Sequence, residues 1–382
     1  MNSRQAIPVV VLTGFLGSGK TTVLNHLLGN RGGTRIGVVV NDFGSIEIDA
    51  MSVAGQVGDS MVSLGSGCLC CAVDGSELDA YLEKLAAPVH RIDVIVIEAS
   101  GLAEPQEMIR MLMASENPDI RYGGMVQVVD AAEFDATRDK HPGTDRHLAV
   151  ADLVVLNKTD RVDGAERACI EGVLGTLCAP GTPVIGADHG RIDPELLFDR
   201  RPWTETRGQL SFEDLLAEAD DHDHDHDHDH DHGHDHEGDH CAHAHASYES
   251  VEFVSEQALS PRRFIDFLDR RPAGLYRIKG FVYFGVPGHE ERYEVHAVGR
   301  FLRFVPQPWG RGEPRLTQLV LIGSGTDGPA LLGELADCRE PSPRELGPES
   351  MWGVLRYVAR REPESEPESE PEPQPEPGAD PG

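Results

Sequence analysis

The stretch VVVLTGFLGSGKTT has the residue types and spacing of a phosphate-binding loop. It fits the pattern G-x-x-x-x-G-K-[ST] and follows an apolar run that predicts a strand. The glycines let backbone N–H groups surround phosphate oxygens, and the start of the next helix adds a positive end. Lys20 is expected to reach the β- and γ-phosphates, and Thr21 to bind Mg²⁺. The residues expected to bind nucleotide here are Gly14, Gly17, Ser18, Gly19, Lys20, Thr21 and Thr22.

Two later stretches predict the rest of a nucleotide site. In IDVIVIEASG, Glu98 ends a predicted strand and could hold Mg²⁺ through water, while Gly101 lets the backbone approach the γ-phosphate. In DLVVLNKTD, the residues Asn157, Lys158 and Asp160 follow another strand. A carboxylate can accept from both N1–H and the exocyclic amine of guanine, and a desolvated carboxylate without such partners is costly. Asp160 therefore favours a GTPase over a small-molecule kinase that uses ATP.

Three cysteines lie close together between these motifs. The stretch GSGCLCCAVDG contains Cys68, Cys70 and Cys71. Their thiolates suit a soft or borderline ion such as Zn²⁺, with Co²⁺ also possible. Three sulfurs so close together cannot complete a relaxed tetrahedron, so a further ligand must come from another segment, water or another protein. A redox pair and unused structural thiols are the alternatives, although no thioredoxin-like frame surrounds them.

A second group of possible metal ligands lies in a low-complexity segment over residues 218–247, which predicts a disordered linker. It holds 11 of the 18 histidines, mostly alternating with aspartate, so it encodes no fixed geometry. Neutral imidazole binds Zn²⁺ and Co²⁺, and protonation should weaken binding as the pH falls toward about 6. We interpret the tract as a metal reservoir, with a dispensable charged spacer as the alternative. The candidate ligands are His222, His224, His226, His228, His230, His232, His234, His236, His240, His243 and His245.

The elements that must position these residues alternate between strands and helices. Apolar runs predict strands at 7–13, 35–41, 92–98, 124–130, 152–158 and 182–187, with helices at 20–30, 76–87, 104–114 and 165–177. Nearly continuous apolar strands are typical of a parallel sheet covered on both faces. The pattern predicts a doubly wound, mostly parallel α/β domain of the P-loop NTPase type over residues 1–217. An extra hairpin over 55–67 is expected to present the cysteines.

A second unit follows the linker. Strands are expected at 248–256, 274–285, 291–305 and 315–324, and helices at 260–270 and 328–338. We predict a small α+β C-terminal domain over residues 248–340 and a C-terminal segment over 341–382 that ends in a disordered Pro/Glu tail. Cys169, Cys178 and Cys338 fall in or at the ends of predicted helices and are expected to pack in the interior.

Composition excludes several classes of function. The net charge is −31 and no block of Lys and Arg is present, which argues against nucleic-acid binding. No run reaches the roughly 18–20 apolar residues that a membrane span needs. An odd number of unevenly clustered cysteines without an export signal favours reduced thiols and a cytoplasmic location.

Taken together, these motifs resemble the CobW family of metallochaperone GTPases over roughly residues 7–340. The most specific element is the CxCC stretch between the P-loop and the strand that ends at Glu98. RIKGFVYF around Lys279 and Gly280 also resembles the C-terminal domain of that family. The resemblance implies a GTPase that binds a transition metal at the CxCC, most commonly zinc, and transfers it to a client protein. Relatives that serve cobalt in cobalamin synthesis or load nitrile hydratase, and a passive metal buffer, are the alternatives.

One stretch departs from the family pattern. The family usually carries Asn-Glu-Phe-Gly-Glu in a switch loop, and this chain has Asn-Asp-Phe-Gly-Ser at 41–45. Asp42 could contribute a carboxylate to the metal or to catalysis, or it could only cap a turn. Glu47 or Asp49 could supply the carboxylate that is lost. The candidate catalytic residues are Lys20, Thr21, Glu98 and Asp42.

Overall fold

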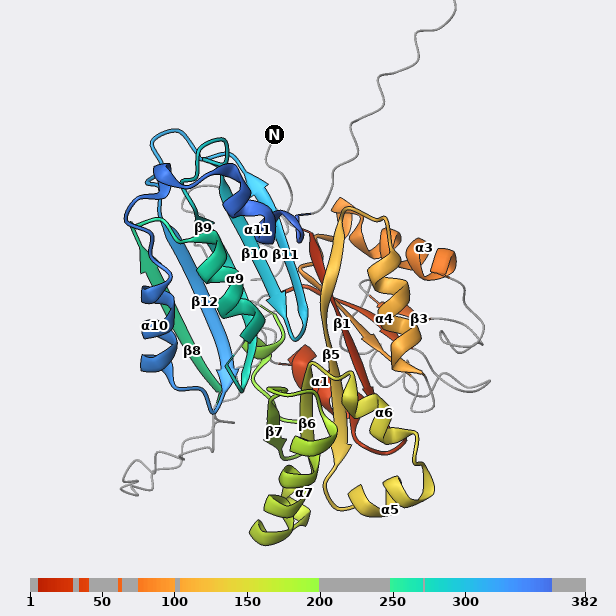
Figure 1. Ribbon diagram of the computed structural model, residues 1–382. Helices are drawn as coiled ribbons and strands as arrows, with labels where there is room; N and C mark the ends of the chain where they lie inside the picture. Colours follow the sequence, from red (N-terminus) through yellow and green to blue (C-terminus); the bar gives the residue numbers. More distant parts are fainter. Residues whose placement is uncertain are drawn as a thin grey trace, which may run out of the picture.

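The chain forms two β-sheets, one parallel and one antiparallel, that lie side by side in the computed structural model (Figure 1). The structure describes residues 6–29, 34–40, 61–63, 75–99, 104–198, 248–270 and 272–358. Within these residues, no helix is both long and apolar enough to cross a membrane.

Among the described residues the parallel sheet has seven strands in the order β3-β2-β4-β1-β5-β6-β7, and this confirms the predicted α/β class. Its strands are β1 (Ile7–Gly14), β2 (Ile36–Val40), β3 (Met61–Ser63), β4 (Val94–Glu98), β5 (Ile120–Asp130), β6 (Leu153–Asn157) and β7 (Val184–Ala187). Its helices are α1 (Lys20–Gly29), α3 (Gly75–Ala86), α4 (Pro105–Ala114), α5 (Phe134–Lys140), α6 (Thr144–Ala149) and α7 (Gly164–Leu177).

Two features of this unit differ from the expectation. The short helices α5 and α6 were not predicted, because one or two turns give too few residues for a helical period. The described part of the expected hairpin, β3, pairs in parallel with β2 and so extends the main sheet. The other residues expected to form that hairpin lie outside the described part of the chain.

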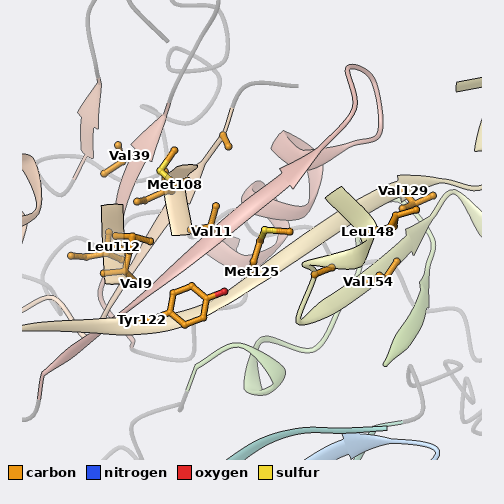
Figure 2. Packing of buried hydrophobic residues seen from close by; sticks show 14 of the residues in the cluster. Val9, Val11, Val39, Met108, Leu112, Tyr122, Met125, Val129, Leu148 and Val154 are labelled. Atoms are coloured by element: carbon orange, nitrogen blue, oxygen red, sulfur yellow. The ribbon is translucent and has the colours of Figure 1, made fainter. Parts of the chain in front are cut away.

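Alternate residues of the central strands enter two separate cores. Val9 and Val11 of β1 belong to a cluster that includes Met108 and Leu112 of α4 (Figure 2). Val10 and Leu12 point to the other face, where they belong to the same cluster as Leu24 of α1. The residues from the C-terminal unit that complete this second cluster are Tyr276, Val298 and Ile322. The sheet is therefore covered on both faces as predicted, and the C-terminal unit supplies part of one cover.

The second sheet, in the part of the chain that the structure describes, has five antiparallel strands in the order β11-β10-β9-β12-β8, which confirms the predicted α+β unit. Its elements are β8 (Tyr248–Ser255), α9 (Pro261–Arg270), β9 (Leu275–Tyr283), β10 (Arg292–Val298), β11 (Phe301–Gln307), β12 (Thr317–Ser324), α10 (Gly328–Asp337) and α11 (Trp352–Leu355). The stretch expected as one strand at 291–305 is two, because Gly299 turns the chain with φ 50°. Met351 and Val354 are buried in this unit's core, so residues after 340 also contribute to it.

Buried polar contacts join the two units beside the shared core. Asp152 Oδ2 accepts hydrogen bonds within the first unit from the Tyr122 hydroxyl and the Met125 N–H, and Asp152 Oδ1 accepts from the Arg300 N–H of the second unit at 3.3 Å. His296 Nε2 donates to the Tyr122 carbonyl at 3.0 Å, and Arg121 pairs with Glu294 at 3.3 Å. Units that share a core and buried polar contacts are not expected to move freely against one another.

The buried imidazole of His296 should make stability depend on pH. Burial, and then the positive charges of Arg121 and Arg277, lower its pKa well below 6.5. The unfolded chain therefore binds a proton that the folded chain excludes. The free energy of unfolding should be greatest above pH 6.5 and should fall below it, by up to about 1.4 kcal/mol per pH unit from this group.

Chemical denaturation of the full chain between pH 7.5 and 5 checks this expectation. His296→Gln keeps an N–H donor for the Tyr122 carbonyl and removes the titrating group, so its stability should fall less steeply with acid. Asn tolerates the left-handed backbone of exposed His189, so His189→Asn should keep the wild-type slope. Equal slopes for wild type and His296→Gln would contradict the assignment.

Candidate nucleotide-binding site

The loop between β1 and α1 has the backbone geometry that only glycine adopts easily. Gly14 has φ 149°, and a Cβ atom there would lie 2.3 Å from the Val128 carbonyl oxygen. Gly19, directly before α1, has φ 98°. Side chains at these positions would strain or block the loop. The loop therefore presents bare backbone at the start of a helix, as a phosphate site requires.

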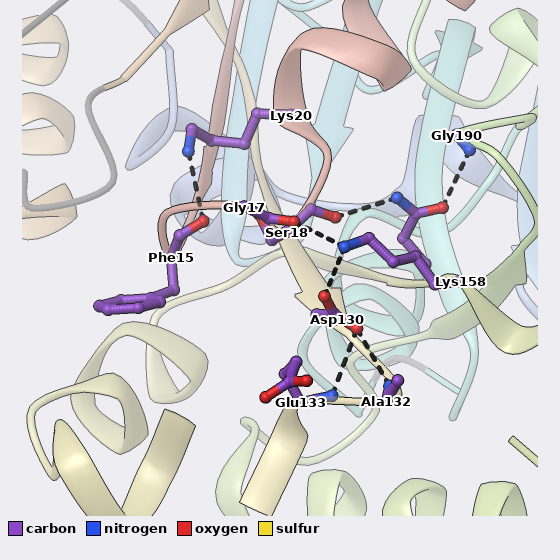
Figure 3. Close-up of polar contacts among 10 residues, drawn as sticks. Phe15, Gly17, Ser18, Lys20, Asp130, Ala132, Glu133, Lys158 and Gly190 are labelled. Atoms are coloured by element: carbon purple, nitrogen blue, oxygen red, sulfur yellow. Dashed lines mark hydrogen bonds and ion pairs between the residues drawn. The ribbon is translucent and has the colours of Figure 1, made fainter. Parts of the chain in front are cut away.

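Lys20 places a positive charge within this loop. Its side chain is buried, and Nζ donates to the carbonyls of Gly14 at 3.0 Å and Phe15 at 3.4 Å (Figure 3). Ser18 is also buried, and its hydroxyl has no hydrogen-bond partner among the described residues. An ammonium group and a hydroxyl at a glycine loop are groups that phosphate oxygens can bind.

Thr21 and Glu98, the two residues expected to hold Mg²⁺, lie in direct contact. The Thr21 hydroxyl donates to Glu98 Oε1 at 2.7 Å. Glu98 is buried and ends β4, which pairs with β1 through Leu12 opposite Glu98. A hydroxyl and a carboxylate are hard oxygen ligands of the kind that Mg²⁺ takes beside phosphates, so the residues present fit this ion.

Asn157 connects the phosphate loop to the loop that follows β7. Its side-chain amide donates to the Ser18 carbonyl at 2.9 Å, and its oxygen accepts from the Gly190 N–H at 2.9 Å. Asp160 is exposed on the turn Thr159–Arg161 that follows β6. The predicted guanine-binding residues therefore lie at the carboxyl end of the sheet, beside the P-loop.

Asp130, which ends β5, lies beside the P-loop and was not predicted from the sequence. Lys158 Nζ lies 2.6 Å from Asp130 Oδ2 and donates to the Gly17 carbonyl at 2.8 Å (Figure 3). Asp130 Oδ1 accepts from the N–H groups of Ala132 and Glu133, at 3.0 and 3.3 Å. A signal was available, because Asp130 ends a predicted apolar strand just as Glu98 does.

A cavity of about 320 Å³ lies between the P-loop and α5. Phe15 and His141 line it, with ring centroids 4.4 Å apart, and Leu16 at its edge is 77% exposed. Basic side chains outnumber acidic ones in its lining, with Arg138, Lys140, Lys158 and Arg161 against Asp130 and Glu133. The cavity is therefore a positively charged, partly apolar hollow that shares one wall with the phosphate loop.

Several predicted site residues lie outside the described part of the chain. They are Asp42, Cys68, Cys70, Cys71, Gly101 and every histidine named above for the linker. Within the residues that the structure describes, no group of three His, Cys, Asp or Glu side chains is placed to hold a metal ion. The metal site thus stays a prediction from the sequence.

The other cysteines divide into two kinds. Cys178 and Cys338 are buried as expected, and burial raises the pKa of each thiol to about 11. The expectation that Cys169 packs in the interior was wrong, because it lies exposed on α7. Apolar residues are spread around this helix, so the sequence does not show which face is buried. In the structure the buried face contains Ile170 and Leu174.

The parallel sheet, the glycine loop with Lys20, and the Thr21–Glu98 pair define a nucleotide-binding protein of the P-loop class. Residues 8–179 match the family model described as CobW/HypB/UreG, nucleotide-binding domain. Residues 248–339 match the model of the Cobalamin synthesis protein cobW C-terminal domain. The chain belongs to the CobW family of P-loop GTPases.

Three curated proteins show how far this similarity extends. A zinc chaperone CobW from a Sinorhizobium species is 32% identical over 353 residues, which cover 83% of this chain and 92% of the relative. A zinc chaperone CobW from Pseudomonas aeruginosa is 31% identical over 370 residues, covering 88% and 92%. The zinc chaperone YjiA from Escherichia coli is 34% identical over 198 residues, covering 50% and 61%.

Proposed function

We propose that this protein is a GTP-hydrolysing metallochaperone that binds zinc and transfers it to a client protein in the cytoplasm. The GTP-binding part of this proposal is supported by one observation: Lys20, the Thr21–Glu98 pair and Asn157 lie together around the P-loop. The metal half is supported by the CxCC stretch and by relatives that are named zinc chaperones.

Each residue of the nucleotide site has a separate task in this proposal. Lys20 binds the β- and γ-phosphates, and Asp160 accepts hydrogen bonds from the guanine edge. Thr21 and Glu98 would hold Mg²⁺, which neutralises charge on the phosphates when bound. Gly101 allows the backbone to approach the γ-phosphate, and Asp42 belongs to the loop that senses it.

The metal is the cargo of the protein. Cys68, Cys70 and Cys71 supply thiolates for Zn²⁺, and Co²⁺ is the second candidate ion. Because three neighbouring thiolates leave the coordination shell incomplete, another ligand can enter and take the ion over. The histidine tract keeps a reserve of weakly bound metal on the same chain.

Metal analysis of protein purified without added metal tests this assignment. Wild type should retain about one zinc ion per chain, as a thiolate site does. A variant with serine at Cys68, Cys70 and Cys71 should lose it, while the exposed Cys169→Ser control should retain it. Equal zinc content in the triple variant and wild type would overturn the proposed site.

A passive metal buffer is the second candidate, favoured by the 11 histidines of the linker. Deletion of residues 222–245 separates the two functions. A chaperone should keep its tight thiolate site after the deletion, whereas a buffer should lose nearly all of its bound metal. The same preparation should hydrolyse GTP at the wild-type rate if the tract is only a reserve.

A further inference from the structure

The carboxylate of Asp130 joins three parts of the nucleotide site. Its Oδ2 pairs with Lys158, whose ammonium also donates to Gly17 of the P-loop. Its Oδ1 accepts from Ala132 and Glu133 at the start of α5 (Figure 3). The Asp130 side chain is only 11% exposed, and that of Lys158 is 27% exposed, so the pair is largely shielded from water. Shielding strengthens the attraction between the two charges.

Lys158 has a backbone conformation that depends on outside support. It has φ 62°, in the left-handed region that costs a non-glycine residue free energy. It is also the residue from which the turn Thr159–Arg161 begins, and this turn bears Asp160. Its side chain is fixed at the far end by Gly17 and Asp130. The Lys158 side chain therefore helps to hold in place the turn that carries Asp160.

We propose that Asp130 is a positioning residue for guanine recognition. It holds Lys158, and Lys158 in turn fixes the turn that presents Asp160 to the base. Without the Asp130 carboxylate, the Lys158 ammonium keeps a single uncharged acceptor, the Gly17 carbonyl, and the turn is held less firmly. This inference rests on the proposed function, because the ligand that it positions is a guanine nucleotide.

The two oxygens of Asp130 allow its tasks to be separated. In Asp130→Asn the amide oxygen can still accept from the N–H groups of Ala132 and Glu133, because asparagine makes the same side-chain-to-backbone turn as aspartate. The amide has no negative charge to offer Lys158. The variant should therefore keep the turn before α5 while it loses the Lys158 anchor.

Titrations of a fluorescent GDP and a fluorescent ADP, together with GTPase kinetics, test the inference on the full chain. Asp130→Asn should bind GDP about tenfold more weakly, the size expected for one charge-assisted hydrogen bond. Affinity for ADP should change by less than about twofold, so that the preference for GDP over ADP falls by about tenfold. The KM for GTP should rise by a similar factor and kcat should change little, as for lost uniform binding.

The control removes another ion-paired carboxylate, Asp145, whose side chain is 37% exposed against 11% for Asp130. Asp145 pairs with Arg138 Nε at 2.8 Å, and this hydrogen bond lowers the pKa of Asp145 below 3.8. Asp145→Asn loses an ion pair near the same cavity without touching Lys158, so it should bind GDP as wild type does.

Two results would overturn the inference while the proposed function stands. One is wild-type GDP affinity in Asp130→Asn. The other is an equal loss for GDP and ADP, which would assign the effect to the P-loop through Gly17. A wild-type chain with no preference for GDP would overturn the proposed function itself, and this inference with it.

Discussion

Lys20→Met is expected to lower the single-turnover rate of GTP hydrolysis by a factor of about 10²–10³, the cost of removing one preorganised charge from a developing phosphate charge. Methionine retains the length and burial of the lysine stem, so the P-loop loses its ammonium without gaining a cavity. The measurement is release of phosphate from GTP with enzyme in excess.

Lys84→Met is the control for a general effect of losing a lysine, since Lys84 is exposed in the last turn of α3. It should hydrolyse GTP at the wild-type rate. A Lys20→Met protein with the wild-type rate and thermal midpoint would contradict the assignment of Lys20 to the phosphates.

Asp160→Asn should weaken GTP binding by roughly 10–100-fold, because hydrogen bonds to a charged group contribute about 1.5–3 kcal/mol. The same change should favour xanthosine triphosphate. Xanthine carries a carbonyl oxygen where guanine carries its exocyclic amine, and an asparagine amide can donate to that oxygen. Competition of the two nucleotides against a fluorescent GDP measures both effects.

Asp163→Asn provides the matched control for this change. Asp163 is three residues further on and caps α7 by accepting from Ala165 and Glu166, a task that asparagine performs equally well. The Asp163→Asn protein should prefer GTP over xanthosine triphosphate to the same degree as wild type. Unchanged selectivity in Asp160→Asn would instead favour a kinase that does not read guanine.

The sequence predicted those parts of the site that lie at the carboxyl ends of apolar strands or in a named motif after them. Lys20 and Thr21 begin the helix that the P-loop joins to β1, and Glu98 ends β4. Because parallel strands share one carboxyl edge, these side chains lie close together. Asp130 could have been found by the same rule, but it ends β5 without a named motif around it. Its role depends on Lys158, which is distant in sequence and meets it only after β5 and β6 pair.

The cover of the second face of the sheet could not be predicted from the sequence. Periodicity shows that Val10 and Leu12 are buried, but it does not show by what. Tyr276 and Val298 supply part of the cover, and both come from strands that read as the core of a separate domain. Contacts between domains are hard to predict from a local sequence pattern. Side chains alternate along a strand in the same way when its outer face contacts solvent and when it contacts another domain.

The most direct test of the proposed function is the zinc affinity of the full chain, measured once with a non-hydrolysable GTP analogue bound and once with GDP bound. Coupled sites typically differ by about 5–150-fold between two liganded states. We expect a difference within this range, and its loss in the variant with serine at Cys68, Cys70 and Cys71. Equal zinc affinities in the two nucleotide states would contradict the proposal that this protein uses GTP to handle metal.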